Sequence, residues 1–204
     1  MTPTYAAIAE RIAVAGLLPR GGFRPAEGDG VPPRADGHPV RALVLIGNAG
    51  PEMWSRFAPF LAANPHLAHP LDAWIEDVVG ALGDALGATP VFAHAGPPFH
   101  PFVRWAQRAE AVHPSPVRLL IHPRYGLWHA YRAALLFAEP VDVPARADQA
   151  APCESCAGRP CLQESHQVSI DAARRACPVG RDFTYGAAQA AFHQRAFVRG
   201  QSGR

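Results

Sequence analysis

The chain has 204 residues, of which 49% are hydrophobic and 18% are charged, so it can bury one sizeable core and is not a disordered protein. Its formal net charge of +2, without a dense run of Lys or Arg, argues against a nucleic-acid-binding protein. No apolar run approaches the roughly 18 residues that span a bilayer, and residues 1–22 lack the basic start and unbroken apolar core of a secretory signal, so we expect a cytoplasmic protein without a membrane partner.

Hydrophobic spacing in the first half of the chain predicts three helices and one buried strand. Residues 5–18 carry apolar side chains at helical spacing, and the turn-rich stretch 21–39 that follows predicts a loop or an irregular hairpin. Residues 40–47, VRALVLIG, form a nearly unbroken apolar run, which is typical of a buried strand. Large apolar residues recur at helical spacing over 52–63 and 71–86 and predict two further helices.

The second half alternates strands and helices until its composition changes. A strand is predicted at 89–95, a helix at 102–112, and two strands at 117–123 and 130–138 joined by the turn RYGLWH. After Ala145 small polar residues and cysteines take over, and a last helix is predicted at 186–198. We therefore expect an α/β or α+β core over residues 1–145 and a small cysteine-rich module over residues 146–204.

All four cysteines of the chain lie within this module, with the spacing C-x2-C-x4-C-x15-C. A C-x2-C turn lets two thiolates converge on one ion, and two further thiolates can complete a tetrahedral set. In a reducing compartment such a cluster favours a metal over a disulfide. The residues leave three alternatives open: an iron–sulfur cluster, a structural zinc ion, and unligated thiols or a labile disulfide. The predicted metal ligands are Cys153, Cys156, Cys161 and Cys177, and the nearby Ser165 and His166 could substitute for one of them.

The stretch from residue 121 to residue 132, IHPRYGLWHAYR, carries a family resemblance. Its Ile-His-Pro-Arg-aromatic-Gly segment, followed by Trp and then Arg, closely resembles the matching segment of the cobalamin-processing chaperones. That class includes the mammalian protein defective in combined methylmalonic aciduria and homocystinuria. The later stretch RDFTYGAAQAAFHQRAF, residues 181–197, resembles the C-terminal segment of the same family.

The position of the cysteines resembles a second family, the epoxyqueuosine reductases, which are cobalamin-dependent iron–sulfur enzymes. The corrinoid-binding core of both families is similar to the flavin nitroreductase fold. The resemblance therefore implies a nitroreductase-like sandwich with a central antiparallel or mixed sheet, plus a small C-terminal ferredoxin-like module holding one cluster, 4Fe-4S by analogy. Ser165 stands where the ferredoxin spacing would place a cysteine, and epoxyqueuosine itself is not the expected substrate.

The resemblance assigns ligand-binding roles within the 121–132 stretch. Arg124 can fork two hydrogen bonds to an amide or phosphate of a corrinoid, and the matching arginine of the chaperone family lies at the glutathione and cobalamin site. Tyr125 and Trp128, with Tyr131, can line a flat apolar cavity of the kind a corrin ring requires. Without the resemblance, a surface arginine and sheet-packing aromatic residues are the alternatives.

Four more residues of the stretch complete the predicted cofactor site. His122 and His129 could ligate cobalt or relay a proton, and ordinary hydrogen-bonded imidazoles are the alternative. Arg132 points either to solvent or to a ligand, and Gly126 serves the turn.

The resulting hypothesis is a cobalamin-binding iron–sulfur protein that acts in the reduction, axial-ligand removal or trafficking of cobalamin. Whether it turns over as a cobalamin reductase or other processing oxidoreductase is left open. The alternatives are a non-enzymatic cobalamin carrier with a structural zinc site and a small ferredoxin-like electron carrier. A corrinoid is the expected small-molecule partner, with an electron-donor protein or a thiol cosubstrate beside it. A flavin is a further candidate cofactor, and nitroreductase-like folds are commonly homodimers.

Overall fold

A four-stranded antiparallel sheet with the order β1-β2-β6-β3 forms the centre of the protein. The computed structural model describes residues 3–163 and 169–202. The strands are β1 (Leu18–Phe23), β2 (Ala42–Ala49), β6 (His129–Phe137) and β3 (Thr89–Phe92), and every neighbouring pair is antiparallel. This confirms a mixed helix-and-strand fold built on an antiparallel sheet, whereas the nitroreductase-like arrangement and the division near residue 145 stay predictions.

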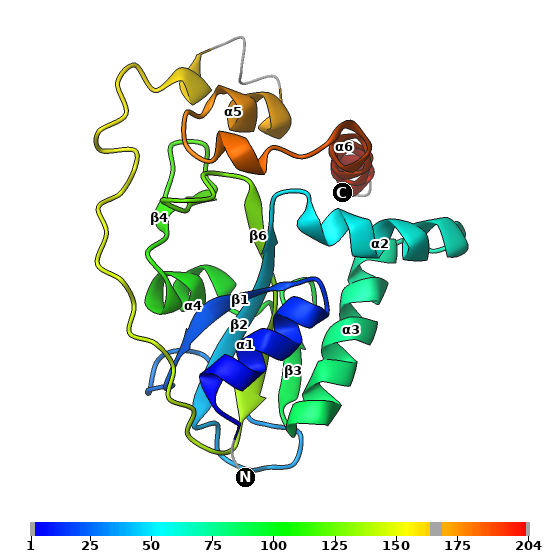
Figure 1. The fold of residues 1–204 in the computed structure, drawn as a ribbon, viewed down its shortest axis with the longest axis vertical. Helices are drawn as coiled ribbons and strands as arrows, with labels where there is room; N and C mark the ends of the chain where they lie inside the picture. The colour runs from blue at the N-terminus through cyan, green and yellow to red at the C-terminus, as the bar shows by residue number, and fades with distance from the viewer. Residues whose placement is uncertain (1–2, 164–168, 203–204) are drawn as a thin grey trace.

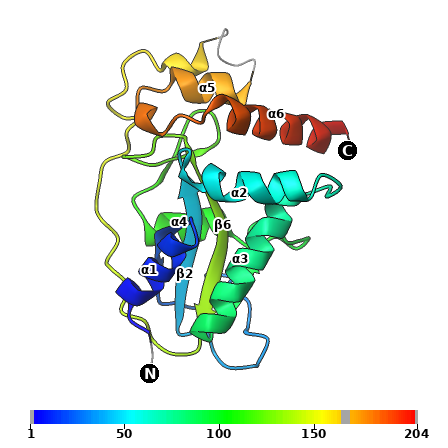
Figure 2. The ribbon, with the colours of Figure 1, turned by 45° about the vertical axis from the view of Figure 1, so that its right-hand side comes forward.

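Helices cover both faces of the sheet, and Figure 2 shows α3 running alongside β2 and β6. Three helices pack on one face and one packs on the other. Val44 and Ile46 of β2 belong to the first core, while Leu43 and Leu45 belong to the second, because successive side chains of a strand point to opposite faces. Burial on both faces explains why β2 is an unbroken apolar run. The first face is covered by α1 (Tyr5–Val14), α2 (Glu52–Ala63) and α3 (Pro70–Leu86), and the second by α4 (Phe102–Ala109).

The C-terminal segments gather at one end of the sheet, where Figure 1 shows α5 and α6 beyond the ends of β2 and β6. Residues 141–150 have no regular structure and run along the side of the molecule to reach this end. The elements there are η1 (Pro160–Leu162), α5 (Ile170–Ala176), η3 (Arg181–Phe183) and α6 (Ala187–Ser202). Among the described residues, no helix is both long enough and apolar enough to cross a membrane.

The strand β1 differs from the sequence prediction, which placed residues 5–18 in a helix and residues 21–39 in a loop or an irregular hairpin. The helix ends at Val14, and β1 begins at Leu18 with a bulge between Pro19 and Gly22. The strand was not predicted because it contains proline and glycine, which are depleted in regular strands. They are tolerated here because β1 is the edge of the sheet, where a missing backbone donor costs little.

The predicted pairing of strands around the RYGLWH turn is also wrong. Only Leu120–Ile121 of the first predicted strand is a strand, β5, and it pairs with β4 (His113–Pro114) in a separate sheet. The following strand, β6, pairs instead with β2 and β3. A single antiparallel bridge between His122 and Gly126 closes the connection. We call residues 122–126 the HPRYG turn.

Candidate functional site

The HPRYG turn is built around the imidazole of His122. Its Nδ1 accepts hydrogen bonds from the backbone N–H of Arg124 at 3.0 Å and of Tyr125 at 3.2 Å. A nitrogen that accepts cannot carry the proton, so the neutral ring holds its hydrogen on Nε2. The ring also stacks on Tyr125 with 4.4 Å between centroids. His122 therefore shapes the turn with Nδ1 and leaves Nε2–H as a donor.

The C-terminal segment lies directly against the turn, backbone on backbone. Gly126 has φ +57°, and a Cβ placed there would lie 2.0 Å from the carbonyl oxygen of Val179. Gly180 has φ +77°, and a Cβ there would lie 2.3 Å from the carbonyl of Tyr125. Only glycine meets both requirements at each position, because positive φ and the close approach each exclude a side chain. In addition to its predicted role in the turn, Gly126 thus permits the close packing of the C-terminal segment.

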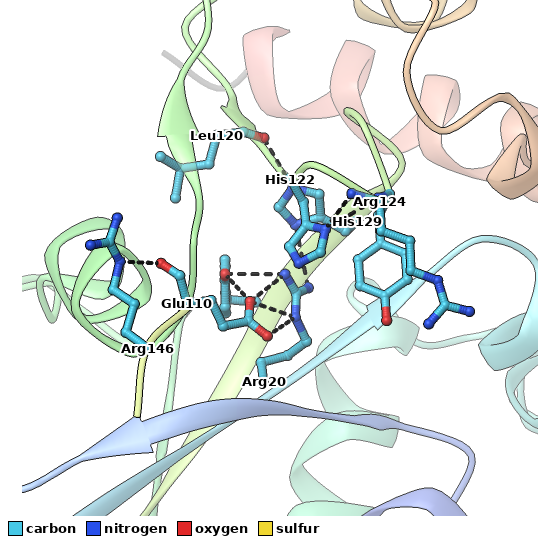
Figure 3. A network of polar contacts seen from close by, with 9 residues as sticks. Arg20, Glu110, Leu120, His122, Arg124, His129 and Arg146 are labelled. Carbon is cyan, nitrogen blue, oxygen red and sulfur yellow. Dashed lines mark hydrogen bonds and ion pairs between the residues drawn. The ribbon is translucent and has the colours of Figure 1, made fainter. Parts of the chain in front are cut away.

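A buried ion pair lies under the turn, where β1 and the end of α4 meet (Figure 3). The Arg20 side chain is 1% exposed, and its guanidinium forks onto the Glu110 carboxylate, with Nε donating to both oxygens at 2.9 Å. Arg20 also donates to the Tyr131 hydroxyl at 3.1 Å, and that hydroxyl donates to Glu110 at 2.7 Å. Such closed networks fix side chains in one arrangement. No local pattern in the sequence indicated Arg20 or Glu110.

His129 extends this network toward the turn. Its Nε2 donates to the carbonyl oxygen of Leu120 at 3.0 Å, and its Nδ1 accepts from Arg20 at 3.3 Å (Figure 3). Burial, reinforced by the Arg20 charge, lowers the pKa of His129 to about 2. The imidazole is therefore neutral with both nitrogens engaged. With both ring nitrogens engaged, His129 has no free nitrogen for a cobalt ion in this arrangement. The arrangement agrees with the alternative of an ordinary hydrogen-bonded imidazole.

Arg124 is the exposed residue of the turn. Its guanidinium lies 5.5 Å from the ring centre of Tyr125 and 5.6 Å from that of Phe183 in η3. Among the described residues it makes no ion pair. The guanidinium is therefore held by cation–π contact, and none of its donors has a hydrogen-bond partner within the described part of the chain.

A second polar group lies on the face of β6 opposite the Arg20 network. Arg132 donates from Nε to the Oδ1 of Asn48 at 2.8 Å. Electrostatic interaction couples Arg132 to Arg174 of α5, and His193 of α6 to both arginines. Gln189 of α6 donates to the Gly50 carbonyl at 3.3 Å, just beyond β2. We call Asn48, Arg132, Arg174, Gln189 and His193 the Arg132 cluster.

The Arg132 cluster has more buried polar atoms than partners. Within the part of the chain that the structure describes, four of its buried atoms lack a hydrogen-bond partner: Asn48 Nδ2, Arg174 Nε, Gln189 Oε1 and His193 Nε2. Asn48 and Gln189 are each 1% exposed. No ion pair of the described residues involves Arg132 or Arg174. Buried polar groups are nearly always satisfied, so cationic and amide groups left without partners indicate a place for an anionic ligand.

Burial and repulsion between like charges lower the pKa of two groups in the Arg132 cluster. Burial lowers the pKa of Arg132, and the Arg174 charge lowers it further against the opposing effect of Tyr185 and Asp72. Burial, then the charges of Arg132 and Arg174, lowers the pKa of His193 to about 4. An anion in the cluster would relieve the mutual repulsion of these groups. The sequence indicated Arg132 as a candidate but not its partners, which come from three other elements.

The predicted aromatic cavity is not formed by the three residues named for it. Trp128 is 0% exposed and packs edge-on against Tyr185 with 5.0 Å between centroids. Tyr131 belongs to the Arg20 network, and Tyr125 lies between His122 and Phe183. A hollow of about 480 Å³ lies elsewhere, lined by residues of the 25–33 loop and Val40. The rings of Tyr125 and Tyr131 both lie against the Arg20 guanidinium, at 5.4 Å and 4.5 Å, whereas Trp128 packs with Tyr185 under α5.

Two arginines of α5 cover the indole of Trp128. The guanidinium carbons of Arg174 and Arg175 lie 5.9 Å and 5.7 Å from its ring centre. Arg174 also lies 5.7 Å from the ring of Tyr185. Trp128 is thus a buried platform that positions α5, and through α5 the Arg174 side of the Arg132 cluster.

The four cysteines are all free, and two of them, Cys161 and Cys177, are buried. Among the described residues, no group of three or more His, Cys, Asp or Glu is arranged to hold a metal ion. Burial, together with the neighbouring thiols, raises the pKa of Cys153, Cys161 and Cys177. An iron–sulfur cluster or a zinc ion at these cysteines stays a prediction. Ser165 and His166 lie outside the described residues.

Three neutral imidazoles give the fold a predictable sensitivity to acid. Burial lowers the pKa of His122 to about 4, of His129 to about 2 and of His193 to about 4, from an ordinary 6.5. The unfolded chain therefore binds more protons than the folded one below pH 6.5, and the stability gained from neutral histidines is lost as the pH falls toward 4. We expect the thermal midpoint to drop between about pH 7.5 and about pH 5.

The matched variant for this effect is His122→Asn, because the Asn carbonyl can accept the same turn hydrogen bonds without titrating. Thermal unfolding of both proteins across this pH range should show a smaller acid loss for the variant. Equal losses in both would mean that His122 does not titrate with unfolding.

Comparison with known proteins gives a likeness to solved structures only. No protein-family model matches the chain, and no curated protein matches it. Among solved structures, the chain is similar to the C. elegans B12-trafficking protein CblC, a homologue of human MMACHC. The two share 17% sequence identity over 90% of each chain, with a TM-score of 0.49.

Proposed function

We propose that the protein binds a corrinoid at the HPRYG turn and acts in cobalamin processing or trafficking, with an anionic thiol such as glutathione as cosubstrate. The observation that carries the proposal is the Arg132 cluster on the strand that follows the turn. It combines two half-buried arginines with buried polar atoms that have no hydrogen-bond partner among the described residues. The family resemblance of residues 121–132 supports the corrinoid, and the cluster supports the anion. The HPRYG turn and Arg132 lie within one short stretch of the chain, residues 122–132.

The Arg132 cluster suits a carboxylate better than a neutral group. Arg132 and Arg174 supply two positive charges, and Asn48 Nδ2 supplies a further donor. Charge-assisted hydrogen bonds from arginine to a carboxylate are about twice as strong as neutral ones, and burial strengthens them. Glutathione carries two carboxylates beside its thiol, so it can place a sulfur near the turn while its charged end occupies the cluster.

The residues of the turn would bind and orient the corrinoid. Arg124 and the Nε2–H of His122 are donors without other side-chain partners among the described residues, and corrinoids carry peripheral amides and a nucleotide phosphate that accept hydrogen bonds. The bound corrinoid supplies the redox chemistry of cobalt, and the protein supplies position and electrostatic field.

A metal at the four cysteines forms no part of this proposed function. The iron–sulfur cluster, with zinc as its alternative, stays a prediction that metal analysis of the purified protein tests. A flavin, an electron-donor protein and a homodimer likewise stay predictions.

The test is a titration of hydroxocobalamin with the full chain, followed by its absorbance spectrum and by calorimetry. We expect the corrinoid bands to shift on binding and the affinity to rise when glutathione is present. Corrinoid bands that stay unchanged at excess protein would contradict the proposed function. A shift without any effect of glutathione would favour a carrier, which is the alternative function.

Replacement of Arg124 by Ala should weaken corrinoid affinity about 10-fold, because one charged hydrogen-bond donor contributes roughly 1.5 kcal/mol. Arg124 is exposed, so the thermal midpoint should not change. Arg41→Ala is the matched control, since Arg41 is an exposed arginine at the far end of β2. Unchanged affinity in Arg124→Ala would remove Arg124 from the site.

A further inference from the structure

Two of the four cysteines lie against the same apolar surface next to the HPRYG turn. Cys177 is 5% exposed and forms a core cluster with Ile121 and Leu127. Cys153 is half-buried and packs against that cluster. The two residues come from separate segments, one before η1 and one at the end of α5.

The other two cysteines do not share this environment. Cys161 lies in η1, which packs against α5, and Cys156 lies in the loop before it. Neither belongs to the cluster of Ile121 and Leu127. All four thiols are close enough to interact electrostatically, and among the thiols that of Cys177 has the largest effect on Cys153. Cys153 and Cys177 are distinguished from the other two by their shared contact with the apolar cluster at the turn.

The position of Cys177 links the pair to the rest of the C-terminal segment. Cys177 is the C-terminal cap of α5, and its N–H donates to the carbonyl of Arg174. Val179 and Gly180, which follow it, are in backbone contact with the turn. A covalent bond at Cys177 would therefore fasten α5 and the turn to the segment that carries Cys153.

We propose that Cys153 and Cys177 are a reversible dithiol–disulfide pair that fastens α5 against the HPRYG turn. A low-molecular-weight disulfide such as glutathione disulfide is the oxidant. The thiolate of one cysteine attacks a sulfur of that disulfide, forms a mixed disulfide and releases one glutathione thiolate. The second cysteine, on losing its proton, attacks the mixed disulfide and releases the second glutathione. The net reaction converts two protein thiols and one glutathione disulfide into one protein disulfide and two glutathione thiols.

The oxidised pair should stabilise the folded protein. A bond between residues 153 and 177 closes a loop that contains η1 and α5 and restricts the unfolded chain. For a chain of this size we expect the thermal midpoint to rise by roughly 5–10 °C on oxidation. This readout requires neither a corrinoid nor an anionic thiol at the Arg132 cluster, so its outcome is independent of the proposed function.

The experiment equilibrates the purified full chain in buffers of reduced and oxidised glutathione, blocks free thiols with an alkylating reagent, and maps cross-linked peptides without reduction. We expect a Cys153–Cys177 peptide that disappears on reduction. Cys153→Ser and Cys177→Ser should each abolish it, whereas Cys156→Ser, the matched control, should retain it. Mapping of the unsubstituted protein decides the question even where a variant fails to fold.

Three outcomes would overturn the proposal. A cross-link between Cys156 and Cys161 in place of the expected peptide would show that the pairing is wrong. Absence of any cross-link in the oxidised buffer would show that the pair is not redox-active. One equivalent of bound zinc, or an iron–sulfur cluster, that protects all four cysteines from alkylation would show a metal centre instead.

Discussion

Replacement of Arg20 by Met is expected to lower the free energy of unfolding by about 3–5 kcal/mol, the cost of leaving one member of a buried ion pair without its partner. The Arg20 side chain is 1% exposed, and its partner Glu110 is 16% exposed. Removal of the guanidinium leaves the Glu110 carboxylate without its cationic partner, next to the Tyr131 hydroxyl. It also leaves His129 Nδ1 without a hydrogen-bond donor. Urea unfolding at neutral pH measures the effect.

Two further variants separate the ion pair from simple loss of packing. The double variant Arg20→Met, Glu110→Leu should lose less stability than the sum of the two single variants, because it leaves no buried charge unpaired. Arg41→Met is the matched control. Arg41 is exposed and has no ion pair among the described residues, so its replacement should change the free energy of unfolding by no more than about 0.5 kcal/mol. Additive losses in the double variant would show that Arg20 and Glu110 act independently.

Replacement of Arg132 by Met is expected to weaken glutathione affinity about 10- to 100-fold, since hydrogen bonds to a charged group contribute roughly 1.5–3 kcal/mol each. The same variant should unfold no more easily than the original protein. Arg132 is half-buried beside Arg174 without an ion-pair partner among the described residues, so its removal relieves the repulsion between two like charges. Calorimetry with glutathione in the presence of hydroxocobalamin, together with thermal unfolding, measures both quantities.

The combination of weaker binding and retained stability is what distinguishes a ligand site from a structural contact. Arg132→Lys is the informative companion variant, because lysine keeps the charge but lacks the planar fork of donors. We expect it to recover part of the affinity. A loss of stability in Arg132→Met without any change in glutathione affinity would make the Arg132–Asn48 hydrogen bond structural and would contradict the anion site.

The Arg20 network and the Arg132 cluster lie on the two faces of the same strand, β6. One face holds satisfied charges, with Arg20, Glu110 and Tyr131 joined in a closed set of hydrogen bonds. The other face holds buried polar atoms, Arg174 Nε and His193 Nε2, that have no hydrogen-bond partner among the described residues. The satisfied side can hold the strand rigid, and a rigid strand presents Arg132 in one orientation. Under the proposed function, the Arg20 face supports the strand and the Arg132 face binds the ligand.

Hydrophobic periodicity was enough to locate most of the helices and the central strand. The unbroken run of β2 indicated burial on both faces, and the helical spacing of α3 indicated one buried stripe, as the structure has them. These patterns are local, because the hydrophobic repeat of a helix or a strand can be recognised within a few consecutive residues. The sequence did not predict the edge strand β1, because Pro19 and Gly21 weaken the local strand pattern. An edge position nevertheless tolerates both residues.

The arrangement of the polar groups required the folded chain. The segment 121–132 could be singled out from its residues, but its side chains could not be assigned to the two faces of β6. Arg20 meets Glu110 across 90 positions, and Arg132 meets Asn48 across 84. Whether a buried charge is paired depends on which distant segments the topology brings within hydrogen-bond reach, and no short stretch of sequence contains that information.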